Sequence, residues 1–291
     1  MKILLLEHPR NIGTENINDI ANAPLSSCLF TGYIAGVLKQ EGHQVDIIEG
    51  YLEKMTYEEI EKKIQHYQPE IIGIHMVYQW KRDEGLYQLI HRLKQGKAVS
   101  YITAYGYYPT FAYEEIFHGC KSLDSIILGE PEVTFLQLVQ KLGEGGSHEG
   151  VKGIAYPQEG GSIFLEYARP IENLDSLPFP ERTPASLSYG EVNIMGSRGC
   201  YGGCTFCYIN PFVGSQSPWR ARSPENILAE IDQIIEKTNM RYFYFTDPNF
   251  FGPGKKGQER ALKLASLLKS RKIRFGIEAR VNDIHEETIE A

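Results

Sequence analysis

The chain has 291 residues, of which 42% are hydrophobic and 23% are charged. Such a composition is typical of a folded globular protein, and the length allows one large or two ordinary domains. The formal net charge of −7 argues against nucleic acid as the main partner, because binding to phosphates needs a positive surface. The apolar run at residues 3–6 is too short for a signal peptide or a membrane span, so we expect a cytoplasmic protein with no membrane partner.

Residues 1–148 alternate short apolar runs with segments of helical periodicity. The runs that predict strands read KILLLEH, QVDIIEG, EIIGIHMVY, VSYITAYGYY and SIILGEP. Strands and helices that alternate at this spacing predict a doubly wound parallel sheet, and continuous apolar runs predict strands covered on both faces. The fold class is therefore α/β, with a Rossmann-like domain at residues 1–148.

Residues 149–190 follow a different pattern. The stretch VKGIAYPQEGGSIFLEYA predicts a β-hairpin that turns at residues 159–161. The next stretch, RPIENLDSLPFPERTPASLS, contains four prolines and little periodicity. We therefore predict that residues 149–190 form a hairpin followed by an interdomain linker.

Residues 191–291 begin a second alternation of strands and helices. Strands are predicted at VNIMGS, RYFYFTD and IRFGIEARV, with helices between them. An eight-unit (β/α) barrel needs about 250 residues, so this segment predicts the first part of a barrel, truncated or completed by something else.

Three of the five cysteines, Cys200, Cys204 and Cys207, lie in the glycine-rich stretch GSRGCYGGCTFCYINPF, directly after a predicted strand. Thiolates are soft ligands suited to iron–sulfur clusters or zinc, and either centre normally takes four ligands. Three thiols leave one coordination position for another molecule. Structural zinc is the less favoured alternative, because it would need a fourth cysteine or histidine nearby and the nearest histidines are His148 and His285.

The other two cysteines, Cys28 and Cys120, are isolated within helix-like patterns. Crowding three cysteines and scattering two is typical of a cytosolic metal site, not of a disulfide framework. We expect both isolated cysteines to be small core residues.

The CxxxCxxC spacing, with the aromatic Phe206 just before the last cysteine, resembles the signature of the radical S-adenosylmethionine superfamily. The resemblance implies that Cys200, Cys204 and Cys207 hold a 4Fe–4S cluster whose fourth iron binds the amine and carboxylate of S-adenosylmethionine. It also implies reductive cleavage to a 5′-deoxyadenosyl radical, with electrons from a donor such as flavodoxin or ferredoxin. Phe206 becomes a candidate contact for S-adenosylmethionine.

Four polar residues at predicted strand ends are further candidates for S-adenosylmethionine binding. Asp247 and Asn249, in FTDPNF, occupy the position of a glycine-glycine-glutamate motif that the family often has and this chain lacks. Their alternative role is to cap the next helix. Glu278 and Arg280 follow the third strand, and their alternative is an ordinary surface ion pair.

A Rossmann-like domain before such a core resembles the cobalamin-dependent branch of the superfamily. The stretches that carry this resemblance are LLLEHP, TGYIAGVLKQEGHQVDII, the loop YGYYPT after the fourth predicted strand, GEPE after the fifth, and DSLPFP in the linker. A dinucleotide site is disfavoured, because NIGTENIND stands where a GxGxxG motif would follow the first strand. The DxHxxG motif, which supplies a histidine to cobalt in many cobalamin proteins, is also absent, so cobalt is expected to lack that ligand.

Ligands of open parallel sheets bind beyond the carboxyl ends of the strands, which here points to residues 8–14, 75–78, 106–110 and 129–132. A flat corrin would lie across these loops. The residues predicted to contact cobalamin there are Thr14, His75, Gly106, Tyr108, Thr110, Gly129 and Glu130. For His75 the alternative is a hydrogen-bonded structural role.

The resemblance implies an enzyme, most simply a methyltransferase that acts on an unactivated carbon or phosphorus centre of a small molecule or peptide. Related enzymes catalyse cyclisation or ring contraction, so these reactions are alternatives. A cobalamin-binding fragment without turnover is the alternative of a different class.

Overall fold

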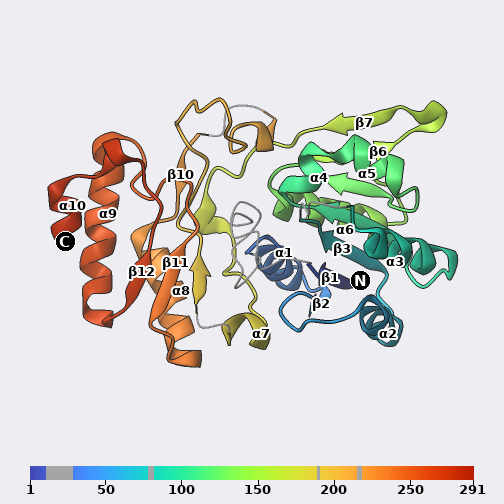
Figure 1. Ribbon diagram of the computed structural model, residues 1–291, viewed down its shortest axis with the longest axis horizontal. Helices are drawn as coiled ribbons and strands as arrows, with labels where there is room; N and C mark the ends of the chain where they lie inside the picture. The colour runs from blue at the N-terminus through green and yellow to red at the C-terminus, as the bar shows by residue number, and fades with distance from the viewer. Residues whose placement is uncertain (11–28, 78–81, 189–190, 215–217) are drawn as a thin grey trace.

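The computed structural model describes residues 1–10, 29–77, 82–188, 191–214 and 218–291. It contains a seven-stranded sheet in the order β2-β1-β3-β4-β5-β6-β7 and a three-stranded sheet in the order β12-β11-β8. The two sheets lie in opposite halves of the elongated molecule, with α1 facing the region between them (Figure 1). None of the helices in these ranges is long and apolar enough to cross a membrane.

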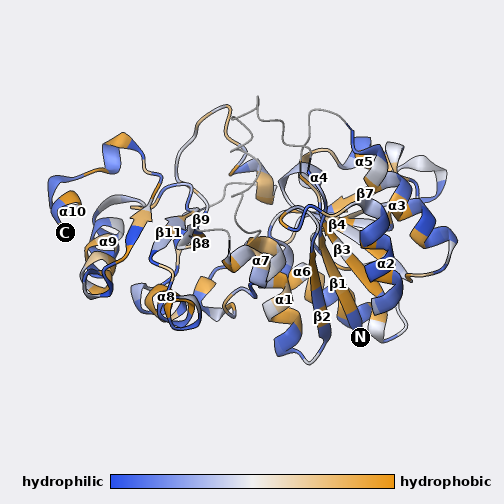
Figure 2. Ribbon diagram, turned by 60° about the horizontal axis from the view of Figure 1, so that its bottom comes forward, coloured by the Kyte–Doolittle hydropathy of each residue, from blue (hydrophilic) through white to orange (hydrophobic). Residues whose placement is uncertain are grey.

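The first sheet confirms the predicted Rossmann-like fold. Its parallel strands are β1 (Lys2–Glu7), β2 (Gln44–Glu49), β3 (Ile71–His75), β4 (Tyr101–Tyr105) and β5 (Ser125–Ile127). All residues of β3, β4 and β5 are buried, as expected for strands covered on both faces. In Figure 2 these strands are apolar, whereas the helices beside them carry hydrophilic residues as well.

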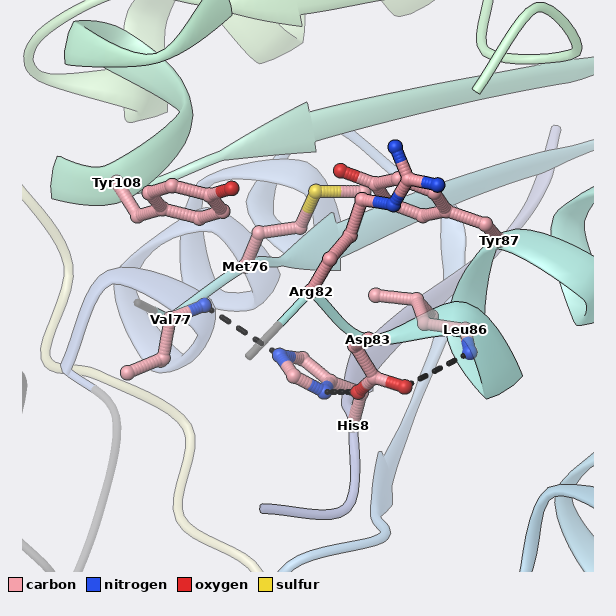
Figure 3. Close-up of a pocket in the computed structure, with 8 residues that line it drawn as sticks. All are labelled: His8, Met76, Val77, Arg82, Asp83, Leu86, Tyr87 and Tyr108. Atoms are coloured by element: carbon pink, nitrogen blue, oxygen red, sulfur yellow. Dashed lines mark hydrogen bonds and ion pairs between the residues drawn. The ribbon is translucent and has the colours of Figure 1, made fainter. Parts of the chain in front are cut away.

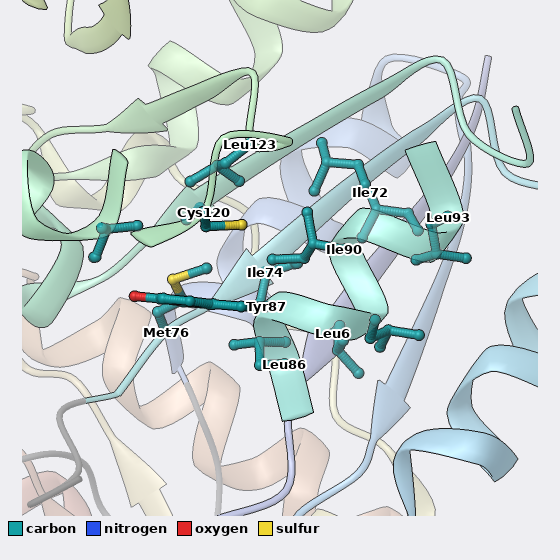
Figure 4. Close-up of a cluster of buried hydrophobic side chains, with 14 of the residues drawn as sticks. Leu6, Ile72, Ile74, Met76, Leu86, Tyr87, Ile90, Leu93, Cys120 and Leu123 are labelled. Carbon is teal, nitrogen blue, oxygen red and sulfur yellow. The ribbon is translucent and has the colours of Figure 1, made fainter. Parts of the chain in front are cut away.

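Helices cover both faces of this sheet. One face packs against α1 (Leu29–Gln40) and α6 (Pro131–Gly143). The other packs against α2 (Tyr57–Tyr67), α3 (Glu84–Gln95) and α5 (Tyr113–Gly119). Cys120 is buried on this second face beside Leu123 and Tyr87 (Figure 4), which confirms its predicted place in the core.

The predicted hairpin is present, and it extends the first sheet. Strands β6 (Ile154–Pro157) and β7 (Ile163–Glu166) are joined by a short turn, η2 (Glu159–Gly161). Strand β6 pairs antiparallel with β5, so the hairpin covers the sheet edge that β5 would otherwise expose. The sequence did not predict this pairing.

The second sheet is built from parallel strands β8 (Val192–Ile194), β11 (Tyr242–Phe245) and β12 (Arg274–Gly276). Helices α8 (Pro224–Thr238) and α9 (Gly254–Leu268) pack together against this sheet around one apolar cluster, as the predicted alternation requires. Short strands β9 (Ser197–Arg198) and β10 (Arg220–Ala221) pair antiparallel at the base of the cysteine-containing segment. The remaining elements are α4 (Tyr107–Phe111), η3 (Leu174–Ser176), α7 (Pro184–Leu187), η4 (Pro211–Val213), η5 (Lys269–Arg271), η6 (Val281–Asp283) and α10 (Glu286–Glu290).

The linker packs into a groove on α1 made by two glycines one helical turn apart. A Cβ atom on Gly32 would lie 2.6 Å from the carbonyl oxygen of Glu181, and one on Gly36 would lie 3.0 Å from that of Phe179. The amide of Glu181 donates to the carbonyl of Gly32 at 3.0 Å. The stretches TGYIAG and DSLPFP, read separately in the sequence, are therefore two sides of one contact.

Replacing Gly32 with Ala should lower the free energy of unfolding by about 1–3 kcal/mol, because the new methyl group overlaps backbone and forces the linker away. Denaturant titration followed by circular dichroism measures this. Gly96→Ala is the matched control, since Gly96 has a right-handed φ of −74° and a Cβ there would meet only the Arg92 carbonyl, at 3.3 Å. Gly32→Ala as stable as the wild type would contradict the tight groove.

Candidate functional site

The carboxyl end of β1 carries a buried carboxylate, Glu7. Arg10 donates to it at 2.6 Å, His75 Nδ1 lies 3.0 Å from it, and the Thr31 hydroxyl also donates to it. Burial alone would raise the pKa of Glu7, but the charges and hydrogen bonds of His75 and Arg10 outweigh it and lower the pKa to about 2. The strand ends therefore carry a fixed negative charge surrounded by donors.

His75, a predicted cobalamin contact, lies at the end of β3 inside this network. Its ring is 2% exposed and stacks on Tyr105 with centroids 5.6 Å apart. Gly106 covers it, because a Cβ on Gly106 would lie 2.7 Å from His75 Cδ2. The φ of +117° at Gly106 also favours glycine. His75 Nδ1 is thus engaged by Glu7, and its contact with a cofactor stays a prediction.

The loops after β4 and β5 are joined through Thr110. Its hydroxyl donates to the Gly106 carbonyl at 2.8 Å and accepts from the Gly129 amide at 3.2 Å. The stretch YGYYPT, expected as a loop, is largely helical, because α4 begins at Tyr107, directly after Gly106. This short helix places three predicted cobalamin residues, Gly106, Thr110 and Gly129, in one hydrogen-bonded chain at the sheet edge.

A small hollow lies beside α4 at the same edge (Figure 3). Tyr108 lines it, together with His8, Met76 and Asp83. His8 Nδ1 lies 3.3 Å from Asp83, and the Val77 amide donates to His8 Nε2 at 3.4 Å. Burial lowers the pKa of His8, so the imidazole stays neutral and can accept that bond. His8 begins one of the predicted ligand loops, whereas Asp83 was not among the predicted site residues.

The other two predicted cobalamin residues are Thr14 and Glu130, and the described structure places neither at this edge of the sheet. Thr14 lies outside the described residues, as does Cys28. Glu130 does not point to an open strand end, because Arg220 binds both its carboxylate oxygens at 2.7 and 3.1 Å. Burial raises the pKa of Glu130, but the charges of Arg198 and Arg220 outweigh this and lower it.

The three cysteines lie on the segment between β9 and β10. Cys204 is exposed, and Cys200 and Cys207 are half-buried. The Gly202 amide lies 3.3 Å from Cys200 Sγ and donates to it. Three soft thiols on one accessible loop suit an iron–sulfur cluster in their donor chemistry. Among the described residues, no three His, Cys, Asp or Glu side chains already stand together as a metal site.

Asn249 and Arg280 lie beside the cysteine loop. The Arg280 guanidinium stacks 4.9 Å from the ring centroid of Tyr201, which follows Cys200 in the chain. The Asn249 amide nitrogen donates to Asp283 at 2.9 Å and lies 3.3 Å from the Tyr201 hydroxyl. Phe206, at the other end of the loop, is 90% exposed.

Asp247 and Glu278 face other partners. Asp247 is fully buried and accepts from the Gly196 amide at 2.6 Å and the Ser197 hydroxyl at 2.8 Å, and burial raises its pKa despite a nearby arginine. The alternative role of Asp247 and Asn249 as helix caps is wrong, because α9 begins after Pro253 without a side-chain cap.

Glu278 accepts from the Tyr244 hydroxyl at 2.8 Å. Since Arg280 stacks on Tyr201 instead, Glu278 and Arg280 point to different partners and not to each other.

Comparison with known families agrees with this architecture. Residues 31–139 match the B12 binding domain family, and residues 194–291 match the Radical SAM superfamily. This chain joins a B12-binding domain to a radical SAM domain. The match confirms the resemblance to cobalamin-dependent radical S-adenosylmethionine proteins that the motifs indicated.

The similar proteins are longer than this chain. It is 27% identical to an uncharacterized methyltransferase of Pyrococcus horikoshii, over 100% of its own length and 62% of the relative's. It is 25% identical to the anaerobic magnesium-protoporphyrin IX monomethyl ester cyclase of Rubrivivax gelatinosus, over 88% and 47%. It shares the fold of the cobalamin-dependent S-adenosylmethionine radical enzyme OxsB, with a TM-score of 0.81 at 24% identity, over 100% and 41%.

Sequence reasoning missed a second carboxylate near Glu7. Glu49 ends β2, is 6% exposed, and accepts from the Thr183 hydroxyl of the linker at 3.0 Å. Burial and the charge of Glu7 raise the pKa of Glu49 to about 7. The available signal was that both QVDIIEG and LLLEHP end their apolar runs on a glutamate.

Because its pKa is raised in the folded state, Glu49 should make stability fall as pH rises from about 4.5 to about 7. Glu49→Gln should remove that fall and raise the free energy of unfolding at pH 8 by about 1–3 kcal/mol, with little change at pH 4.5. Urea unfolding at both pH values measures this. The exposed Glu236→Gln is the control, and an unaltered pH slope in Glu49→Gln would count against the raised pKa of the buried carboxylate.

Proposed function

We propose that this protein is a radical S-adenosylmethionine enzyme with a 4Fe–4S cluster and cobalamin, and that it transfers methyl groups to an unactivated carbon or phosphorus centre. The observation that carries the proposal is that the cysteine loop lies against the strand ends of the B12-binding domain. The ring of Phe212, on the cysteine loop, packs on the ring of Tyr107, in α4, with centroids 4.3 Å apart. The relative named a methyltransferase supports the reaction class.

Cys200, Cys204 and Cys207 would hold the cluster, because they are the three thiols of one accessible loop. When bound, the cluster supplies the electron that cleaves S-adenosylmethionine to a 5′-deoxyadenosyl radical, and cobalamin supplies the methyl group. The chain's task is to place both against one substrate and to exclude water.

The polar groups beside the cysteine loop would orient S-adenosylmethionine. Asn249 and Arg280 both contact Tyr201 beside the cysteines, so we assign them to the polar ends of S-adenosylmethionine. The exposed Phe206 would pack on its apolar part. Asp247 and Glu278 would act less directly, through the Gly196–Ser197 backbone and Tyr244.

Cobalamin would lie over the carboxyl ends of β1, β3, β4 and β5. Gly106, Tyr108 and Gly129 border that edge, and Thr110 fixes the two loops that carry them. Corrin binding would use this surface of backbone and aromatic groups, with His75 held beneath Gly106.

The substrate would be a small molecule or a peptide, and the electron donor a flavodoxin or ferredoxin in the cytoplasm. Cyclisation is the second candidate reaction, because one relative is named a cyclase. Both reactions would begin with the same radical, so the cysteine chemistry does not depend on the choice.

Replacing Cys200, Cys204 or Cys207 with Ala should abolish the brown chromophore and the release of 5′-deoxyadenosine, because each removes one of three iron ligands. Iron content and chromatographic detection of 5′-deoxyadenosine, after anaerobic reconstitution with S-adenosylmethionine and reductant, measure both effects.

Cys120→Ala is the matched control for these variants. The Cys120 thiol is buried, and burial raises its pKa to about 11. The Cys120→Ala variant should therefore keep the wild-type iron content and lose only packing contacts. Wild-type protein that holds zinc in place of iron, or a Cys204→Ala variant with full iron, would overturn the assignment.

A further inference from the structure

Four buried charges lie where the two domains meet. Glu130 and Glu132 come from the start of α6, directly after β5, whereas Arg198 lies in β9 and Arg220 in β10. Arg198 donates to both carboxylate oxygens of Glu132, with Nη1 at 3.1 Å from Oε2. Arg220 binds both oxygens of Glu130. Each pair is a bidentate bond across the domain junction, 66 and 90 residues apart in sequence.

The two arginines occupy the base of the cysteine loop. Arg198 and Arg220 are register partners in the β9–β10 ladder, so the residues between them form a loop closed at its base. Cys200 follows Arg198 by two residues. Both carboxylates come from one turn of the B12-binding domain, which therefore holds both ends of the loop.

The Arg198–Glu132 pair is buried, and the side chains of Arg220 and Glu130 are 9% and 6% exposed. Glu132 is 0% exposed and Arg198 is 6% exposed. Burial lowers the pKa of Arg198, but Glu132 and Glu130 outweigh it and raise that pKa above its usual range. The Arg198 guanidinium also lies 5.5 Å from the ring centroid of Tyr33 on α1. It is thus fixed by carboxylates on one side and an aromatic ring on another.

A buried ion pair is a poor source of stability, because removing two charges from water costs about as much as their attraction returns. Unlike an apolar contact, however, a buried ion pair fixes the relative orientation of its two partners. A guanidinium bound through two parallel N–H···O bonds is fixed in plane and in distance, as an aliphatic contact is not.

We propose that Arg198 and Arg220, bound to Glu132 and Glu130, are positioning residues that set the separation between the cysteine loop and the corrin-binding strand ends. This rests on the proposed function, in which a substrate radical made at the cluster must reach the methyl group carried by cobalamin. The two glutamates of the GEPE stretch then hold the cysteine loop in place, and Glu130 contributes to cofactor placement through Arg220.

The separation of the two cofactors is measurable without substrate. A reduced 4Fe–4S cluster and cob(II)alamin each carry an unpaired electron, so pulsed electron paramagnetic resonance detects the magnetic coupling between them. In the wild-type holoenzyme we expect one defined coupling. Arg198→Lys and Arg220→Lys keep the charge and lose the bidentate bond, and should broaden or shift that coupling while iron and cobalt contents stay at wild-type levels.

Arg271→Lys is the matched control, because Arg271 forms a bidentate pair with Asp232 at 2.8 and 3.1 Å away from the junction. Should Arg198→Lys fail to fold, Glu130→Gln is a milder change. It weakens the bidentate bond to Arg220 and should shift the coupling in the same way. Coupling in Arg220→Lys and Glu130→Gln identical to the wild type would overturn the positioning role alone. A wild-type protein that lacks either paramagnetic signal would overturn the proposed function and the positioning role together.

Discussion

Buried arginines are the constraint on which the junction depends. A guanidinium loses its water on burial and must find carboxylates, so the four charges at the base of the cysteine loop oblige the two domains to meet in one arrangement. A third buried arginine also bonds to both halves of the molecule. Arg222, 2% exposed, bonds to Glu230 at 2.5 Å and to the Tyr33 hydroxyl of α1 at 3.2 Å.

Two uncharged contacts work beside these ion pairs. The linker lies against the glycine groove of α1, and ring contacts join α4 to the cysteine loop, with Tyr107 and Tyr208 centroids 4.7 Å apart. Carboxylates, backbone and aromatic rings thus bring the cysteine loop to the edge of the first sheet where parallel strands end. A ligand over that edge and a cluster on that loop would therefore be neighbours.

The regular elements of both sheets could be predicted from the sequence, because apolar runs and helical periodicity are local signals. The attachment of the hairpin to β5 could not, since strand pairing order leaves no local trace. Helix α4 was read as a loop because its five residues are too few for periodicity. Asp247 suggested a cap, yet its partners at Gly196 and Ser197 stand about fifty positions earlier.

The candidate site divides in the same way. Spacing identified the cysteines, because one loop must supply all three thiols, and strand ends located the sheet edge. The partner of Glu130 could not be predicted, because an ion pair between residues 90 positions apart leaves no local pattern in the sequence. Glu7 and Glu49 were missed because an isolated polar residue after an apolar run looks the same whether it is exposed or buried.

If the proposed function is right, one chain holds both cofactors. Metal analysis of anaerobically reconstituted protein, supplied with iron, sulfide and hydroxocobalamin and then separated by gel filtration, tests this most directly. We expect about four irons and about one cobalt per chain in the same peak. Iron without cobalt would contradict the cobalamin assignment, and cobalt without iron would contradict the cysteine site.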